Sequence, residues 1–210
     1  MSFGQNSTRE SALYVVAELS RRLSAKDRDG LRRACRDMVS EARCDPMALE
    51  TLWLSVVEGG ATPTVSLPLT QLLDLGDDEL FVNYSSGSVP VAALLKLVSD
   101  RLTMEAPPRT SSARGDWRPL VLLLLAGPPA DGDAAAQNLD LLSRHPSRPI
   151  VIVMTTCDLP FTAPFVQLLT DNPLVMQFIT GKEIHRAWSY YRPFGPYWED
   201  SMWDSQPPVA

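Results

Sequence analysis

Few side chains in this sequence have the type and spacing that catalysis or metal binding requires. The 210 residues include two histidines, and neither His145 nor His185 has a Ser, Cys or Asp companion at a recognisable spacing. The three cysteines, Cys35, Cys44 and Cys157, are an odd number at unrelated spacings, which is typical of reduced thiols rather than of a disulfide framework or a zinc cluster. We therefore expect no enzymatic activity.

The glycine pairs that could begin a phosphate-binding loop lack the rest of the motif. Gly59-Gly60 is not followed by Lys-Ser/Thr, and Gly127 precedes two prolines, which have no backbone N–H group to donate. We expect no nucleotide and no other cofactor.

Charge is unevenly distributed along the chain. The net charge is −6, but residues 20–43 contain eight Lys/Arg and four Asp/Glu, so this stretch carries +4 and the remainder −10. Three interpretations stay open for the basic stretch: a solvated helix face, a surface for an acidic protein partner, or a nucleic-acid contact. Because the stretch has no aromatic residues and the acidic remainder would repel phosphates, we expect no nucleic-acid partner.

The apolar content is that of a globular protein without a membrane span. Hydrophobic residues make up 45% of the chain, which is enough for a buried core. The apolar run at 120–126 is too short to cross a bilayer, and the polar N-terminus has no signal-peptide core. The sequence predicts a cytoplasmic protein that does not contact membranes.

The elements that must position the polar side chains alternate between strands and helices. Short apolar runs predict buried strands, and apolar residues at i, i+3, i+4 and i+7 predict amphipathic helices. Strands are predicted at 13–17, 52–57, 64–67, 120–125, 150–154 and 174–178, and helices at 31–42, 91–102, 133–142, 163–169 and from 180. This order predicts an α/β fold with a doubly wound, mostly parallel sheet and helices on both faces.

Prolines set several of the predicted boundaries. Asp45-Pro46 is expected to break the first helix before the second strand. Pro68 cannot donate to a ladder, so the preceding residues 64–67 are predicted to form an antiparallel edge strand. Ser88 and Pro90 together are a helix-start signal.

Four segments carry a resemblance to a known family. They are LYVVAELS at 13–20, DPMALETLWLSVV at 45–57, GDWRPLVLLLLAGPP at 115–129 and LLTDNPLVMQFIT at 168–180. In this order they resemble the von Willebrand factor A (vWA) domains, and within these the intracellular bacterial branch similar to tellurite-resistance-associated proteins. The resemblance covers residues 12–191, which leaves 1–11 as an N-terminal extension and 192–210 as a C-terminal tail.

Members of this family usually carry a metal-ion-dependent adhesion site at the carboxyl ends of the strands. It consists of Asp-x-Ser-x-Ser after the first strand, a Thr on a later loop and an Asp after the central strand, whose oxygens hold an ion such as Mg²⁺. The matching positions here are Glu18, Ser20 and Arg22, then Ser88, then Ala126 and Gly127. Arg22 places a cation at a ligand position, and Ala126 removes a carboxylate. Because the local charge changes by two units against a divalent ion, the resemblance implies a degenerate site without metal.

Two alternatives follow from the altered motif. In the first, Arg22 pairs with Glu18 across the turn or with an acidic side chain of a protein partner. In the second, the domain still binds its ligand through Mg²⁺ or Mn²⁺, and Asp131 or Asp133 supplies the missing carboxylate. Calorimetry with either ion would discriminate between them.

The tail contains aromatic residues that have no element of their own, namely Phe194, Tyr197, Trp198 and Trp203. They either fold back onto the domain or anchor to a partner, since large aromatics are favoured at interfaces.

The resemblance implies a non-enzymatic binding or scaffold protein in a cytoplasmic multi-protein complex of a stress-response or conflict system. The partners that it implies are other vWA proteins, kinases, phosphatases or ATPases. The expected binding surface is formed by the loops at 18–24, 84–88 and 126–131.

Overall fold

The structure is a computed structural model that describes residues 10–18, 33, 36–59, 62–76, 90–105, 118–125 and 129–155, with side chains up to residue 153. Its strands are β1 (Ser11–Glu18), β2 (Leu52–Glu58), β3 (Thr64–Gln71), β4 (Leu120–Leu125) and β5 (Ile150–Thr155). Its labelled helices are α2 (Pro46–Thr51), α3 (Val91–Glu105) and α4 (Gly132–Ser143). Residues 36–43 are also helical and precede α2.

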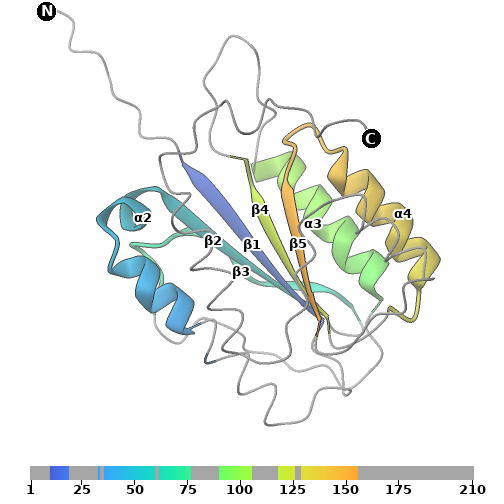
Figure 1. The fold of residues 1–210 in the computed structure, drawn as a ribbon, viewed down its shortest axis with the longest axis horizontal. Coiled ribbons are helices and arrows are strands. Elements are labelled where there is room, and N and C mark those ends of the chain that lie inside the picture. Colours follow the sequence, from blue (N-terminus) through green and yellow to red (C-terminus); the bar gives the residue numbers. More distant parts are fainter. Residues whose placement is uncertain are drawn as a thin grey trace, which may run out of the picture.

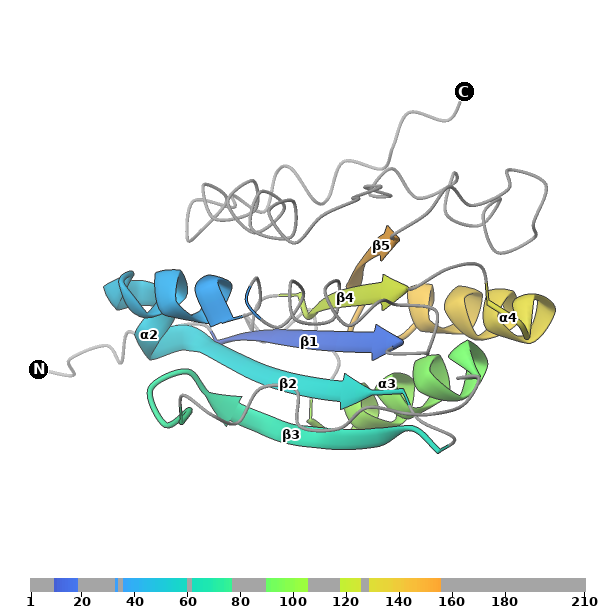
Figure 2. The same ribbon diagram turned by 90° about the horizontal axis from the view of Figure 1, so that it is seen from below.

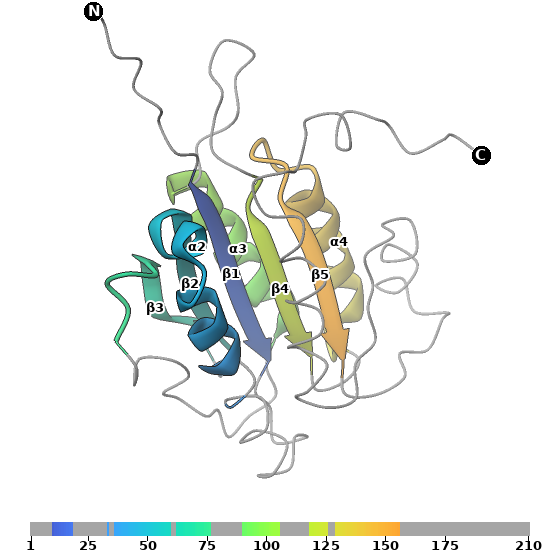
Figure 3. The same ribbon diagram turned by 60° about the vertical axis from the view of Figure 1, so that its left-hand side comes forward.

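The five strands form one sheet in the order β3-β2-β1-β4-β5 (Figure 2). β1 pairs in parallel with β2 and β4, and β4 pairs in parallel with β5. The antiparallel strand is β3, which lies at one edge of the sheet. β1, β4 and β5 therefore point the same way (Figure 3), and we call the side where they end the carboxyl end of the sheet. The predicted α/β class, mostly parallel sheet and antiparallel edge strand are confirmed.

The sheet has a topological switch point between β1 and β4. From β1 the chain goes to β2 on one side, and β4 on the other side follows only after β3 and α3. In open α/β sheets, ligands bind outside the carboxyl ends of the strands at such a point. The fold therefore directs attention to the ends of β1 and β4.

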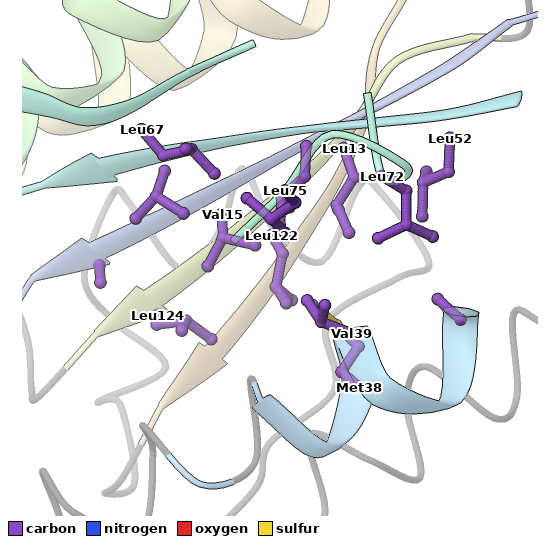
Figure 4. Packing of buried hydrophobic residues seen from close by; sticks show 14 of the residues in the cluster. Leu13, Val15, Met38, Val39, Leu52, Leu67, Leu72, Leu75, Leu122 and Leu124 are labelled. Carbon is purple, nitrogen blue, oxygen red and sulfur yellow. The ribbon is translucent and has the colours of Figure 1, made fainter. Parts of the chain in front are cut away.

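Helices cover both faces of the sheet. On one face Leu13 and Val15 of β1 pack in a cluster with Met38 and Val39 of the helical residues 36–43 (Figure 4). On the other face the alternate residues of β1 pack against α3 and α4, which lie on the opposite side of the sheet from α2 (Figure 1). Side chains alternate along a strand, so β1 contributes to both cores and is buried from Leu13 to Glu18.

The patterns of α3 and α4 explain why they form and which side they bury. In α3 the buried residues are Val91, Leu94, Leu95, Val98 and Leu102, which recur at helical spacing on one stripe. The buried residues of α4 are smaller over its first turns and follow the same spacing: Ala135, Ala136, Leu139 and Leu142. The alanines allow α4 to lie close to α3.

Asp45-Pro46 ends the first helix as predicted, but a short helix that was not predicted, α2, lies between this pair and the second strand. The Asp45 carboxylate accepts a hydrogen bond of 2.9 Å from the backbone N–H of Met47, and Pro46 occupies the first turn. Asp at the N-cap with Pro at the next position is a helix-start signal, so the pair ends one helix and begins another.

The edge strand β3 is longer than predicted and passes through Pro68. It extends from Thr64 to Gln71, and Pro68 is exposed within it. Proline is tolerated there because a strand at the edge of a sheet does not use every N–H group for pairing. The strand at 174–178, the helices at 163–169 and from 180, the loop at 84–88 and the boundary at 191 lie outside the described residues. Within the described ranges no helix is both long and apolar enough to cross a membrane.

Candidate functional site

Glu18 is the last residue of the central strand and lies beside the switch point. It is in register with Leu125, the last residue of β4. Its side chain is on the face covered by α3 and α4, because it alternates with Val16 and Tyr14, which pack there. Glu18 is only 6% exposed and has an interaction partner. A buried carboxylate requires one. The structure thus places the first residue of the predicted motif where the fold predicts a site.

A second buried carboxylate, Glu58, ends the neighbouring strand. Glu58 is in register with Ala17, and the backbone N–H of Gly59 donates to the Ala17 carbonyl at 2.8 Å. It is 2% exposed, and it too has a partner. Because Ala17 and Glu18 face opposite sides of the sheet, Glu58 and Glu18 do too. Glu58 was not predicted as a buried residue, because a Glu at the end of an apolar run is typical of the solvated end of a strand.

Asp131 connects the turn after β4 to the first turn of α3. Its carboxylate oxygens accept hydrogen bonds from the backbone N–H groups of Val91, at 3.1 Å, and Ala92, at 2.9 Å. These N–H groups have no acceptor within their own helix, because α3 begins at Val91. Val91 is fully buried, so an unpaired N–H group there would be costly.

Asp131 does not cap the helix that it precedes. It occupies the N-cap position of α4 and its carbonyl accepts from Ala135, but its side chain makes no capping bond to α4. The sequence position alone would predict that local bond. The acceptor role of Asp131 toward α3 therefore appears only when the two helices are placed together.

The first turns of α3 and α4 both lie toward the carboxyl end of the sheet (Figure 1). The side-chain amide of Asn138 in α4 donates to the Ala92 carbonyl at 2.7 Å. Ala92 is thus held at its N–H by Asp131 and at its C=O by Asn138. The start of α3 is fixed to α4 by side chains at two points.

The remaining residues of the predicted site lie outside the described part of the chain. These are Ser20, Arg22, Ser88, Ala126 and Gly127, and the same holds for the tail residues Phe194, Tyr197, Trp198 and Trp203. Chain order links them to the described ends: residue 19 follows β1, residue 126 follows β4, and Ser88 precedes Pro90 at the start of α3.

The described residues at this end of the sheet do not fit a divalent cation. No group of three His, Cys, Asp or Glu side chains that could hold a metal occurs in the described ranges. Asp131, which was the alternative source of a carboxylate, already uses both oxygens on α3. Asp133 is exposed in the first turn of α4.

At the amino end of the sheet, His145 is held in a buried network. Its Nδ1 accepts from the backbone N–H of Ser147 at 3.2 Å and lies 2.7 Å from the Ser147 hydroxyl, while its Nε2 lies 3.0 Å from the Thr103 hydroxyl. Burial lowers the pKa of His145 below its usual value. Ser147, two residues away, is thus a hydrogen-bond partner of His145 that the sequence analysis did not name. Because both residues are buried, the pair has a structural role and joins α3 to the turn before β5.

Tyr14 forms a second network in the amino half of the sheet. Its hydroxyl donates to Glu105 Oε2 at 3.0 Å, and Glu105 also forms an ion pair with Arg101. Tyr14 is fully buried, and burial together with the adjacent Glu105 carboxylate raises the pKa of its phenol. A phenol with a raised pKa stays neutral and acts here as a hydrogen-bond donor.

Comparison with known proteins reveals likeness in structure only. No protein-family model and no curated protein sequence matches the chain. Proximal thread matrix protein 1 of the mussel byssus is similar, with a TM-score of 0.63 at 14% identity over 87% of this chain and 47% of that one. The manganese-loaded TRAP protein of Plasmodium vivax has a TM-score of 0.59 at 13% identity, over 89% of this chain and 74% of that chain.

Of these three structures, the VWA domain of SpRpn10 is the one that the match covers over the largest share of its own length. It has a TM-score of 0.55 at 12% identity, and the match covers 80% of this chain and 86% of that domain. By contrast, this chain spans about half of the mussel protein. Identities this low carry no information about ligands, but the shared arrangement of sheet and helices is clear. The chain has the fold of the von Willebrand factor A domains.

Proposed function

We propose that this chain is a non-enzymatic protein-binding domain of the vWA fold that captures its partner at the carboxyl end of the sheet without a metal ion. The observation that carries the proposal is the position of the carboxylates there. Glu18 is buried at the end of β1, and Asp131 gives both oxygens to backbone groups of α3. An ion would need several oxygens directed at one point, and these two carboxylates are already used within the protein.

The departures in the sequence support the same conclusion. Arg22 stands where the vWA motif has a hydroxyl ligand, and Ala126 stands where it has a carboxylate. We propose that the adhesion site is degenerate and that Arg22 contributes the positive charge that an ion supplies in metal-dependent relatives. A guanidinium binds a carboxylate through two parallel hydrogen bonds, so an acidic side chain of the partner is the chemistry it fits.

The side chains with shifted pKa values support a binding role rather than catalysis. Tyr14 and His145 lie toward the amino end of the sheet, and their polar atoms are bonded to Glu105, Ser147 and Thr103. A general base has to face a site that a substrate can reach. These two side chains are themselves buried, at 0% and 8% exposure.

The setting that we propose follows the resemblance of the sequence motifs. It is a cytoplasmic multi-protein complex of the type found with tellurite-resistance-associated proteins, in a stress-response or conflict system. The partner would be another vWA protein, a kinase, a phosphatase or an ATPase.

The experiment that tests the proposal is affinity capture from the native host with the immobilised chain, in wild-type and Arg22→Glu forms. Reversing a charge that pairs with a partner costs about 2–5 kcal/mol, so the captured protein should be lost from the Arg22→Glu sample. Arg144→Glu is the matched control, because Arg144 is the exposed C-cap residue of α4 and its ion pair with Asp140 is on the surface. Capture that survives Arg22→Glu, or that is lost equally in both variants, would reject the proposed surface.

A further inference from the structure

We infer that Asp131 is a positioning residue, which cross-links the two loops of the proposed binding surface in place of a cation. One loop leads out of β4 and ends at Asp131, and the other leads into α3 at Val91. The Asp131 carboxylate joins them by bonds to the N–H groups of Val91 and Ala92. The inference rests on the proposed function for the use of these loops, whereas the contact itself is independent of any partner.

The electrostatics of the contact favour a fixed link. The amino end of a helix carries a partial positive charge, and a carboxylate placed there is stabilised by the helix dipole as well as by the hydrogen bonds. α3 has 15 residues, so its dipole is well developed. Its first turn has no acidic residue of its own, which leaves Asp131 from the other segment as the anion at this end.

The geometry limits how far the two segments can separate. Asn138, two turns into α4, bonds to the Ala92 carbonyl, while Asp131 bonds to the Ala92 N–H group. Ala92 therefore cannot move along α4 without breaking a bond at one of its two polar groups. Pro90, one residue before α3, has a carbonyl that accepts from Leu94, so the first turn of α3 is itself closed.

A cation at this end of the sheet would serve the same mechanical purpose by binding oxygens from both loops. In this chain the Asp131 carboxylate and the N–H groups of Val91 and Ala92 already join the two segments, and neither hydrogen bond needs an ion. The cross-link should consequently persist in the presence of chelators. It should also be insensitive to added Mg²⁺.

Amide hydrogen exchange measured by NMR on the full chain tests this inference. In Asp131→Ala the amides of Val91 and Ala92 should exchange roughly 2- to 30-fold faster, the range that corresponds to loss of a helix cap. Asp131→Asn keeps one acceptor oxygen and should give a smaller increase, and it serves if Asp131→Ala does not fold. Asp133→Ala, an equal change of charge two residues away, should leave both amides as in the wild type.

The same measurement with chelator and with added ion separates a protein cross-link from an ionic one. Exchange at Val91 and Ala92 in the wild type should be equal in EDTA and in 10 mM MgCl₂. Unchanged exchange in Asp131→Ala, or faster exchange of the wild type in EDTA, would overturn the inference. Because no partner is present, this outcome is independent of the capture experiment, in which the proposed function succeeds or fails on Arg22→Glu.

Discussion

A carboxylate lies at each end of α3, and the two are held in different ways. At the amino end Asp131, from another segment, bonds only to backbone N–H groups of the helix. At the other end Glu105, the last residue of α3, needs two side chains, the Tyr14 hydroxyl and the Arg101 guanidinium. The difference follows from the helix dipole, which attracts an anion at the amino end and repels one at the carboxyl end.

The two ends of the sheet differ in the same way as the two ends of α3. Around Glu105 and His145 the bonds join side chains of neighbouring elements, and the buried members Tyr14 and His145 tie β1 and the turn before β5 to α3. At the carboxyl end the bonds of Asp131 hold backbone at the start of a helix. β1 and β4 end there in register, at Glu18 and Leu125. The side-chain networks thus lie toward the amino end of these strands, and the binding surface that we propose lies at their carboxyl end.

The largest effect on stability is expected from substituting Tyr14, in the amino half of the sheet. Tyr14→Ala should lower the free energy of unfolding by about 3–5 kcal/mol, because it leaves a cavity where a fully buried ring packed. Tyr14→Phe keeps the ring and removes only the bond to Glu105, so it should cost about 0.5–1.5 kcal/mol. Urea unfolding of the three proteins measures both values. If Tyr14→Phe lowers the free energy of unfolding as much as Tyr14→Ala, the bond to Glu105 rather than the packing of the ring stabilises this part of the sheet.

A smaller effect is expected at the carboxyl end of the sheet. Asp131→Ala should lower the free energy of unfolding by about 0.5–2 kcal/mol, the usual cost of losing a helix cap. Urea unfolding in 0.5 M NaCl measures it, because salt screens a dipole contribution but leaves direct hydrogen bonds in place. The control, Asp133→Ala, should be nearly neutral in that salt. Equal costs for Asp131→Ala and Asp133→Ala would mean that charge at the start of α4, and not the bond to α3, is what matters.

The pH dependence of stability tests whether His145, at the amino end of the sheet, has a structural role. Its pKa is lowered in the folded protein, so the unfolded chain binds the proton more readily. The contribution of His145 is fully present above pH 6.5 and is lost as the pH falls through the lower folded-state pKa. The slope that it adds is at most about 1.4 kcal/mol per pH unit.

His145→Gln removes this titration and leaves His185 in place. Unfolding free energies of both proteins, measured from pH 7.5 to pH 5, should therefore diverge in slope, with the wild type losing stability faster. Parallel curves would show that protonated His145 is tolerated in the fold, and that its network with Ser147 and Thr103 does not require the neutral ring.

The strands and long helices could be predicted because each follows a repeating apolar pattern. The run of residues 120–125 specifies a buried interior strand by itself, and the stripe from Val91 to Leu102 specifies one face of a helix. Each pattern is local, so one stretch of sequence contains all the information. Glu18 follows the first apolar run directly and is the last residue of β1, whereas its role in the motif comes from the resemblance and stays a prediction.

The contacts that define the carboxyl end could not be predicted in this way. Asp131 and Val91 are 40 residues apart, and nothing in either segment shows that they meet. The sequence places Asp131 in the loop at 126–131, before the helix predicted at 133–142, but the packing of α4 on α3 brings its side chain to the start of α3. The contact of His145 with Thr103 could not be predicted for the same reason, because the two residues are 42 positions apart and meet only through the packing of α3.

The smallest expected effect is that of added metal. If the wild type bound Mg²⁺ with a dissociation constant of 1 mM, then 10 mM ion would stabilise it by about 1.4 kcal/mol, which is about 3–6 °C in melting temperature. We expect no shift relative to NaCl of equal ionic strength, because Asp131 is bonded to α3 and the motif has lost a carboxylate at Ala126. The double variant Arg22→Ser, Ala126→Asp restores the ligand types of the motif and should gain a shift with Mg²⁺ or Mn²⁺. A shift in the wild type would favour the metal-dependent alternative, whereas a shift in the double variant alone would show that these two substitutions removed the ion from a fold that can still hold it.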